Sequence, residues 1–171
     1  MTDEHLLAVI TGLLETPFPN SDVSQGDRDS APAHHLQVLR RTDDFWEDRA
    51  EERYEAAERE IEAARQPLVA ALTARWGTPM AVDLTPSWRD SRTLPEPLDR
   101  LSQVSGEVLV WWPAGTERWV GLAVGQADNE FPIELIAAVG IGQFPVTVPG
   151  SPQRGTNAST ADAPRRPLDA P

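Results

Sequence analysis

The N-terminal half of the chain carries apolar residues at helical spacing in two stretches. The first, residues 3–15, opens with acidic residues that suit a helix N-terminus, and it predicts a short amphipathic helix. Residues 16–33 are rich in Pro, Ser, Asp and Gly, and are expected to form a loop or linker. The predicted helix either caps the core or is a tethered docking element, and the sequence leaves both alternatives open.

The second stretch, residues 42–76, predicts the dominant helix of the protein. Its start near Thr42 offers N-cap chemistry with acids in the first turn, and Gly77 follows its end. Pro67 removes an intrahelical hydrogen bond, so we expect a kink or a division there. The other side of this helix is highly charged and is expected to face water. Its apolar stripe consists of Trp46, Ala50, Tyr54, Ala57, Ile61, Ala64, Leu68, Leu72 and Trp76.

Residues 107–126 predict a β-hairpin whose strands are apolar on both faces. Because side chains alternate along a strand, Trp112 shares a face with Val108 and Val110 and is expected to be core, whereas Trp111 points to the opposite face. One face of the second arm is made of Gly and Ala, which would let another backbone or a helix approach closely. Both faces therefore require a covering layer, supplied either by the chain itself or by a partner.

Shorter elements surround this hairpin. Residues 80–84 predict a short strand, and residues 98–104 a helical turn. Residues 129–140 predict a helix, with Pro132 near its first turn and Gly140 at its end. The order of predicted elements is helix, strand, strand, strand, helix.

The expected fold class is α+β. A long N-terminal helix, kinked or split near Pro67, packs on a small, mainly antiparallel sheet of three or four strands, and a C-terminal helix closes the fold. Residues 1–33 form the short helix and linker, and residues 34–148 form a single α+β domain in which 144–148 is either a fourth edge strand or the start of the tail. Residues 149–171 lack a periodic apolar face and are predicted to be a disordered tail.

Charge narrows the classes of partner. The 171 residues contain 27 acids and 15 basic residues, all of them arginine, which gives a net charge of −12. Nucleic-acid binding is not expected, because neutralising phosphates requires clustered basic residues. An acidic surface suits a basic protein partner, or it only keeps the chain soluble, and the sequence leaves both alternatives open. The arginine-only usage is typical of a GC-rich bacterial genome.

The absence of cysteine excludes disulfides and thiolate metal sites, and fits a reducing compartment. The apolar run at residues 6–14 is too short to span a membrane and lacks the basic start of a signal peptide, so a cytoplasmic location is expected. His5, His34 and His35 complete no zinc-binding spacing, and His34 and His35 are expected to be a surface pair. No metal and no cofactor are predicted.

The candidate residues for partner binding are aromatic and basic. Trp88 lies in a polar loop beside Arg89 and Arg92, where a purely structural role is not required, and the predicted hairpin adds Trp111. These residues, the acidic surface and the lack of catalytic motifs favour a non-catalytic protein-binding protein of a bacterial cytoplasm. Such a protein would be an immunity- or antitoxin-like neutraliser or a dedicated chaperone.

Two other classes of function remain open. A small hydrolase or isomerase would need a pocket that brings a carboxylate and an arginine together, and its candidate residues are Asp83, Trp88, Arg89, Asp128 and Glu130. A structural component of a phage-like or secretion assembly is the second alternative. In architecture alone, the order of elements resembles small bacterial immunity proteins and secretion chaperones.

Overall fold

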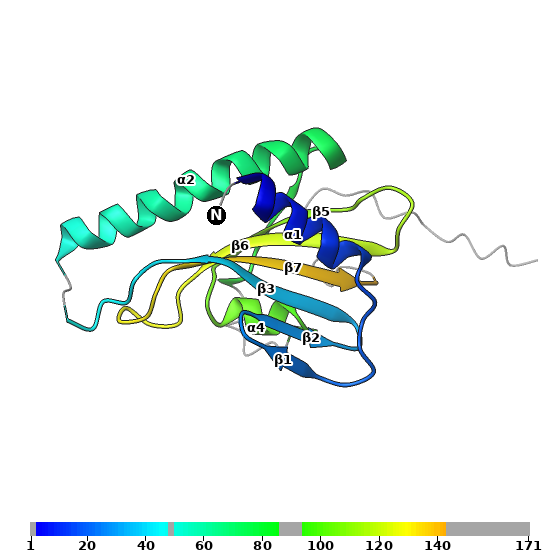
Figure 1. Cartoon of the computed structure of the whole chain (residues 1–171), viewed down its shortest axis with the longest axis horizontal. Helices are drawn as coiled ribbons and strands as arrows, with labels where there is room; N and C mark the ends of the chain where they lie inside the picture. Colours follow the sequence, from blue (N-terminus) through cyan, green and yellow to red (C-terminus); the bar gives the residue numbers. More distant parts are fainter. Residues whose placement is uncertain (1–2, 48–49, 86–93, 143–171) are drawn as a thin grey trace, which may run out of the picture.

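The computed structural model describes residues 3–47, 50–85 and 94–142. Within these ranges the chain forms one antiparallel sheet of seven strands in the order β1-β2-β3-β7-β6-β5-β4 (Figure 1). The strands are β1 (Val23–Gln25), β2 (Arg28–Ala31), β3 (His34–Arg41), β4 (Met80–Asp83), β5 (Glu107–Trp111), β6 (Arg118–Gly125) and β7 (Glu134–Ile141). The helices are α1 (Asp3–Glu15), α2 (Glu51–Trp76) and α4 (Leu98–Ser102).

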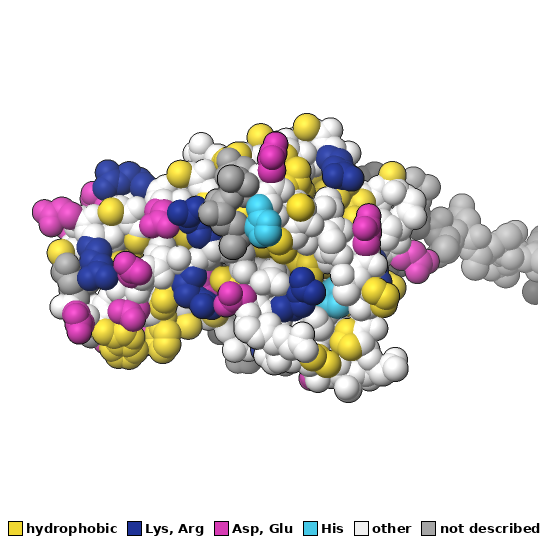
Figure 2. Space-filling model, viewed as in Figure 1, with side chains coloured by type: hydrophobic (Ala, Val, Ile, Leu, Met, Phe, Trp, Pro, Cys, Tyr) yellow, Lys and Arg dark blue, Asp and Glu magenta, His cyan; other side chains and the backbone are white. Residues whose placement is uncertain are grey.

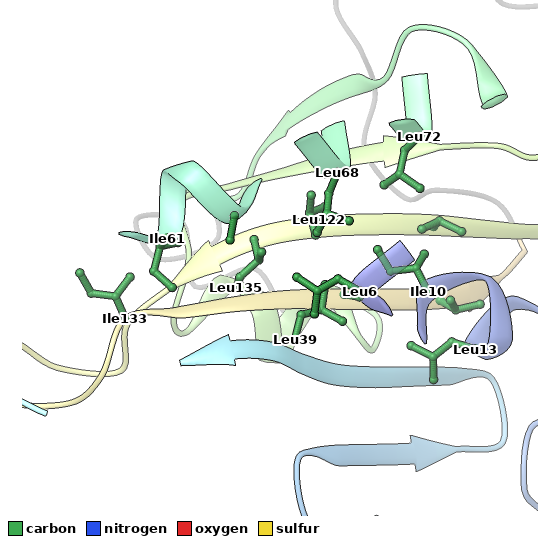
Figure 3. Packing of buried hydrophobic residues seen from close by; sticks show 14 of the residues in the cluster. Leu6, Ile10, Leu13, Leu39, Ile61, Leu68, Leu72, Leu122, Ile133 and Leu135 are labelled. Atoms are coloured by element: carbon green, nitrogen blue, oxygen red, sulfur yellow. The ribbon is translucent and has the colours of Figure 1, made fainter. Parts of the chain in front are cut away.

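Helices α1 and α2 lie together on one face of the sheet (Figure 1), and α4 packs on the other. The larger core lies between the two helices and the sheet. Figure 3 shows leucine and isoleucine side chains of both helices pointing toward side chains of the central strands. Those labelled on the helices are Leu6, Ile10, Leu13, Ile61, Leu68 and Leu72, and those on β3, β6 and β7 include Leu39, Leu122 and Leu135.

The hairpin expected within residues 107–126 is confirmed as β5 and β6. Its two faces belong to different cores: Trp111 packs in the cluster under α1 and α2, and Val108 and Val110 pack in the cluster beside α4. Both layers that cover it come from the chain itself. The small-residue face does permit close approach, because a Cβ added at Gly125 would lie 3.0 Å from the carbonyl oxygen of Val104.

The predicted α+β class is confirmed, but the predicted closing helix and the sheet of three or four strands are wrong. Residues 134–141 form β7, which is the central strand of the sheet and pairs with β3 and β6. A strand buried on both faces carries a continuous apolar run, and its length and alanine content also suit a helix. Pairing with two neighbours decides the outcome here, because it satisfies the backbone of the strand on both sides.

The long helix ends at Trp76 as predicted, but it begins at Glu51 and not near Thr42. It is also a single helix that continues through Pro67, so the predicted division is wrong. Proline deprives only the carbonyl of Ala63 of its intrahelical donor, and Ala63 lies on the exposed side of α2 where water can satisfy that group. Buried residues on both sides of Pro67 hold the helix to the sheet.

Residues 16–33, expected to be a loop or linker, contain β1 and β2, which extend the sheet beyond β3. The predicted helix 3–15 is confirmed as α1, and it packs on the core through its apolar side. His34 and His35 are not a surface pair, because both are buried on β3. The predicted strand or tail start at 144–148 and the predicted disordered tail at 149–171 lie outside the described residues.

Candidate protein-binding site

Two loops meet at one end of the sheet, where β3 leads toward α2 and where β6 turns back into β7 (Figure 1). The backbone N–H of Thr42 donates to the carbonyl of Ile133 at 3.0 Å, and the N–H of Ile133 donates to the Thr42 hydroxyl oxygen at 3.0 Å. The N–H of Phe45 donates to the carbonyl of Glu130 at 2.9 Å. These bonds extend the pairing of β3 with β7 and are the reason that α2 starts only at Glu51.

Aromatic side chains fill this end of the protein. Phe45 is buried and stacks on Tyr54 of α2, with ring centroids 4.4 Å apart. The Tyr54 hydroxyl donates to Oε1 of Gln126 at 2.6 Å, and Nε2 of Gln126 donates to the carbonyl of Phe131 at 2.7 Å. These two bonds join α2 to the loop between β6 and β7, and the bond from Phe45 to Glu130 joins that loop to the one after β3. This arrangement fixes the outer face of the two loops.

Two aromatic rings lie on that outer face, and we call Trp46 and Phe131 the aromatic pair. Their centroids are 5.5 Å apart in an edge-to-face arrangement. Trp46 is 54% exposed and Phe131 is 44% exposed. Figure 2 shows hydrophobic side chains gathered at this end of the molecule. Exposed aromatic rings on a fixed support are common anchors of protein interfaces, because little conformational entropy is lost when a partner covers them.

Carboxylates surround the aromatic pair. The loop after β3 and the first turn of α2 carry exposed acids, and acidic side chains lie close to the hydrophobic ones at this end in Figure 2. Arg53 is the arginine described at this end: its Nη2 donates to the carbonyl of Asp44 at 3.0 Å, and its guanidinium lies 5.9 Å from the centroid of the Phe45 ring. Among the described residues of this region acids outnumber Arg53, so their net charge is negative. The acids are Asp43, Asp44, Glu47, Glu51 and Glu52.

Of the four residues predicted for partner binding, only Trp111 lies within the described residues. Trp88, Arg89 and Arg92 lie outside the described residues. Trp111 is 1% exposed in the core beneath the helices, and its indole N–H has no hydrogen-bond partner in the described part of the chain. Trp112, which was expected to be core, is 43% exposed, because β5 ends at Trp111 and the next residue leaves the sheet.

The residues predicted for an enzyme pocket are not brought together by the structure in the part that it describes. Asp83 ends the edge strand β4, and its Oδ1 accepts a hydrogen bond from the backbone N–H of Thr85. Asp128 and Glu130 lie in the loop between β6 and β7, and β5 separates β4 from β6 in the sheet. Neither the hollow beside the β1–β2 hairpin nor the hollow between α2 and β6 is lined by these carboxylates.

Comparisons with protein families, curated proteins and solved structures found no match to this chain. Among the described residues, no group of three or more His, Asp or Glu side chains is arranged to hold a metal ion. No helix in the described ranges combines the length and apolar character needed to cross a bilayer. The geometry of the site is thus the basis for a functional proposal.

Sequence reasoning missed the aromatic pair. Trp46 falls in the apolar stripe predicted for the long helix and Phe131 within the predicted closing helix, and neither is predicted as a binding residue. The available signal was the Phe45–Trp46 dipeptide between acidic residues, which is unusual for a buried helix face.

Proposed function

We propose that this chain is a non-catalytic protein-binding protein, and that a basic protein partner docks on the aromatic pair and the carboxylates around it. The observation that carries the proposal is the contact between Trp46 and Phe131, two large aromatic side chains that remain exposed on loops fixed by hydrogen bonds. Apolar rings supply the buried centre of an interface, and acidic groups supply its polar rim.

The charge around this site supports a basic partner. Lysine or arginine side chains could pair with the carboxylates and also lie over the exposed face of the Trp46 indole, an arrangement that is favourable for a cation and an aromatic ring. The charge of the whole chain, −12, would steer the same partner over a longer range. Within this class, the roles that we propose are an immunity- or antitoxin-like neutraliser or a dedicated chaperone in a bacterial cytoplasm.

Affinity capture with matched variants tests the proposal. The purified chain is immobilised and exposed to lysate of the source cell, and captured proteins are identified by mass spectrometry. We expect a basic protein that is released as salt is raised, and that the Trp46→Ala, Phe131→Ala double variant no longer retains. Truncating interface anchors of this kind costs about 2 kcal/mol or more each in binding free energy.

Trp112→Ala is the matched control, because Trp112 is also an exposed tryptophan but lies at the opposite end of β5 from the two loops. Capture by this variant should equal that of the unchanged chain. Circular dichroism of every variant verifies that the fold is retained. Equal capture by the control and the double variant, or capture of acidic proteins only, would contradict the proposal.

A further inference from the structure

A second feature of the molecule lies away from the aromatic pair and is independent of the proposed function. A hollow of about 630 Å³ opens between the β1–β2 hairpin, the start of β3 and the residues at the start of α4. Hollows of roughly 300–1,000 Å³ are the size that small molecules occupy in proteins. The polar residues described as lining this hollow are Asp22, Ser24, Asp29, Ser30, His34, Glu96 and Arg100.

His34 is the buried polar group of this hollow. It is 5% exposed, and side-chain alternation along β3 places it on the same face as Leu36, which packs in the cluster beside α4. The ring of its neighbour His35 points to the opposite face, where it contacts Ser30 and Thr16. In the described part of the chain, no hydrogen bond is made by the ring nitrogens of His34, and these nitrogens are not fully enclosed, because Trp111 Nε1 is the one buried side-chain polar atom without a partner there.

Among the described residues that line the hollow, carboxylates outnumber cations. Arg100 forms an ion pair with Asp29, with Nη2 and Oδ2 3.2 Å apart. Among the described residues that line the hollow, Arg100 is the one arginine, and its positive charge also acts on Glu96, so three carboxylates share one guanidinium there. Burial, followed by the positive charge of Arg100, lowers the pKa of His34, so its imidazole is neutral at pH 7 and able to accept a hydrogen bond. Burial is also the main cause that raises the pKa of Glu96.

We propose that this hollow binds a small organic cation through an ammonium or guanidinium group. The cation donates one hydrogen bond to the unpartnered ring nitrogen of His34 and others to the carboxylates of Asp22 and Glu96. An ammonium has three donors and no acceptor, which matches a set of groups that all accept. An anionic ligand is disfavoured, because it would meet three carboxylates and a guanidinium that is already paired with Asp29.

Isothermal titration of the full chain with defined probes tests this site. The cationic probes are n-butylamine and agmatine, and the anionic probes are butyrate and inorganic phosphate. We expect saturable binding of at least one cation with Kd below about 1 mM, and no binding of the anions. Glu96→Gln and Asp22→Asn keep the shape of exposed side chains, and each should weaken binding by about tenfold, which corresponds to 1.4 kcal/mol.

His34 is tested by a measurement that does not depend on a buried substitution. In protein labelled with ¹⁵N at histidine, the cation should shift the ring nitrogens of His34 and leave those of the exposed His5 unchanged. Glu117→Gln, an exposed change outside the hollow, is the matched control and should bind as the unchanged chain does. The proposal is overturned by a Kd above about 1 mM for both cations, by binding that the Glu96 and Asp22 variants leave intact, or by ligand shifts that spare His34.

Discussion

Trp111 and Trp112 are neighbours in the chain, but the end of β5 places them in different surroundings. Trp111 is enclosed between the sheet and the helices, whereas Trp112 is largely exposed. Trp111→Ala should therefore lower the free energy of unfolding by about 3–5 kcal/mol, the cost typical of truncating a large core side chain. Trp112→Ala should cost far less. Urea unfolding of both variants measures the difference, and a greater loss at Trp112 would contradict the assignment of the two environments.

Glycines on two elements give a second contrast between single residues. Gly140 on β7 lies beneath the ring of Trp119, and a Cβ added there would be 2.3 Å from Cζ2 of that indole. Gly140→Ala must displace the buried ring and should cost roughly 1–3 kcal/mol, as overpacking of a core does. Gly12 lies in α1, and apart from its chain neighbours and the adjacent helix backbone no described atom lies within 4 Å of an added Cβ. Gly12→Ala should stabilise the protein by roughly 0.5–1 kcal/mol, because alanine loses less backbone freedom in a helix.

Thermal unfolding of these two variants is the measurement, with the unchanged chain alongside. We expect the melting temperature to fall in Gly140→Ala and to rise in Gly12→Ala, although both variants replace glycine by alanine. If Gly140→Ala were as stable as Gly12→Ala, Trp119 would not be packed against β7 as the structure shows.

At the scale of elements, the sequence predicted those whose pattern is local. The α1 helix, the end of α2, the short β4 strand and the β5–β6 hairpin follow from apolar spacing and turn residues within each segment. The wrong predictions concern segments whose secondary structure depends on hydrogen bonds to residues distant in the sequence. β7 is a strand because β3 and β6 flank it, and residues 42–47 leave the helix because Thr42 and Phe45 bond to the loop before β7.

The candidate site was predicted less well than the fold, for the same reason. Its aromatic pair joins residues 85 positions apart in the chain, so no local pattern reveals the contact. The β1–β2 hairpin was also missed, because its two strands are only 3 and 4 residues long and consist mostly of polar residues. Such short edge strands depend on the neighbouring strand more than on their own propensity.

The junction between α1 and the sheet contains a buried histidine that should make stability depend on pH. His35 contacts the carbonyl of Thr16, just after α1, and Nη1 of Arg118 donates to the carbonyls of Leu14 and Thr16 at 2.7 and 2.6 Å. Burial is the largest cause that lowers the pKa of His35, and the same holds for His34. Protons therefore bind the unfolded chain more readily than the folded one.

The sign of the effect follows from that difference. Stability from the neutral histidines is fully present above the unfolded-state pKa of about 6.5, and it decreases as the pH falls below that value toward the lowered pKa of the folded state. Urea unfolding at about pH 7.5 and about pH 5.5 should show this loss. His35→Gln should reduce the loss, and His5→Gln, at an exposed position on α1, should leave it unchanged. An identical pH dependence in all three proteins would contradict the prediction.

At the scale of the whole molecule, screening of the net negative charge by salt should stabilise the fold and weaken binding of a basic partner. The chain has 27 acids against 15 arginines, and the ion pairs among its described residues are largely exposed, such as those of Arg40 with Glu60 and Arg41 with Asp27. Exposed pairs contribute about 0–1 kcal/mol each. Salt weakens these pairs and also weakens the repulsion among the excess acids. We expect the stability gained from reduced repulsion to exceed the stability lost from the pairs.

The melting temperature should therefore rise as sodium chloride is increased from about 0.01 M to about 0.1 M, a range over which the Debye length falls from about 30 Å to about 10 Å. Over the same range, association with the proposed basic partner should become slower and weaker, because screening removes the attraction that brings the two proteins together. Calorimetry and surface plasmon resonance on the same buffers measure the two effects. A melting temperature that falls with salt would show that local ion pairs, and not net charge, control the stability of this fold. Binding that strengthens with salt would instead identify the aromatic pair as the anchor of an apolar interface without a basic rim.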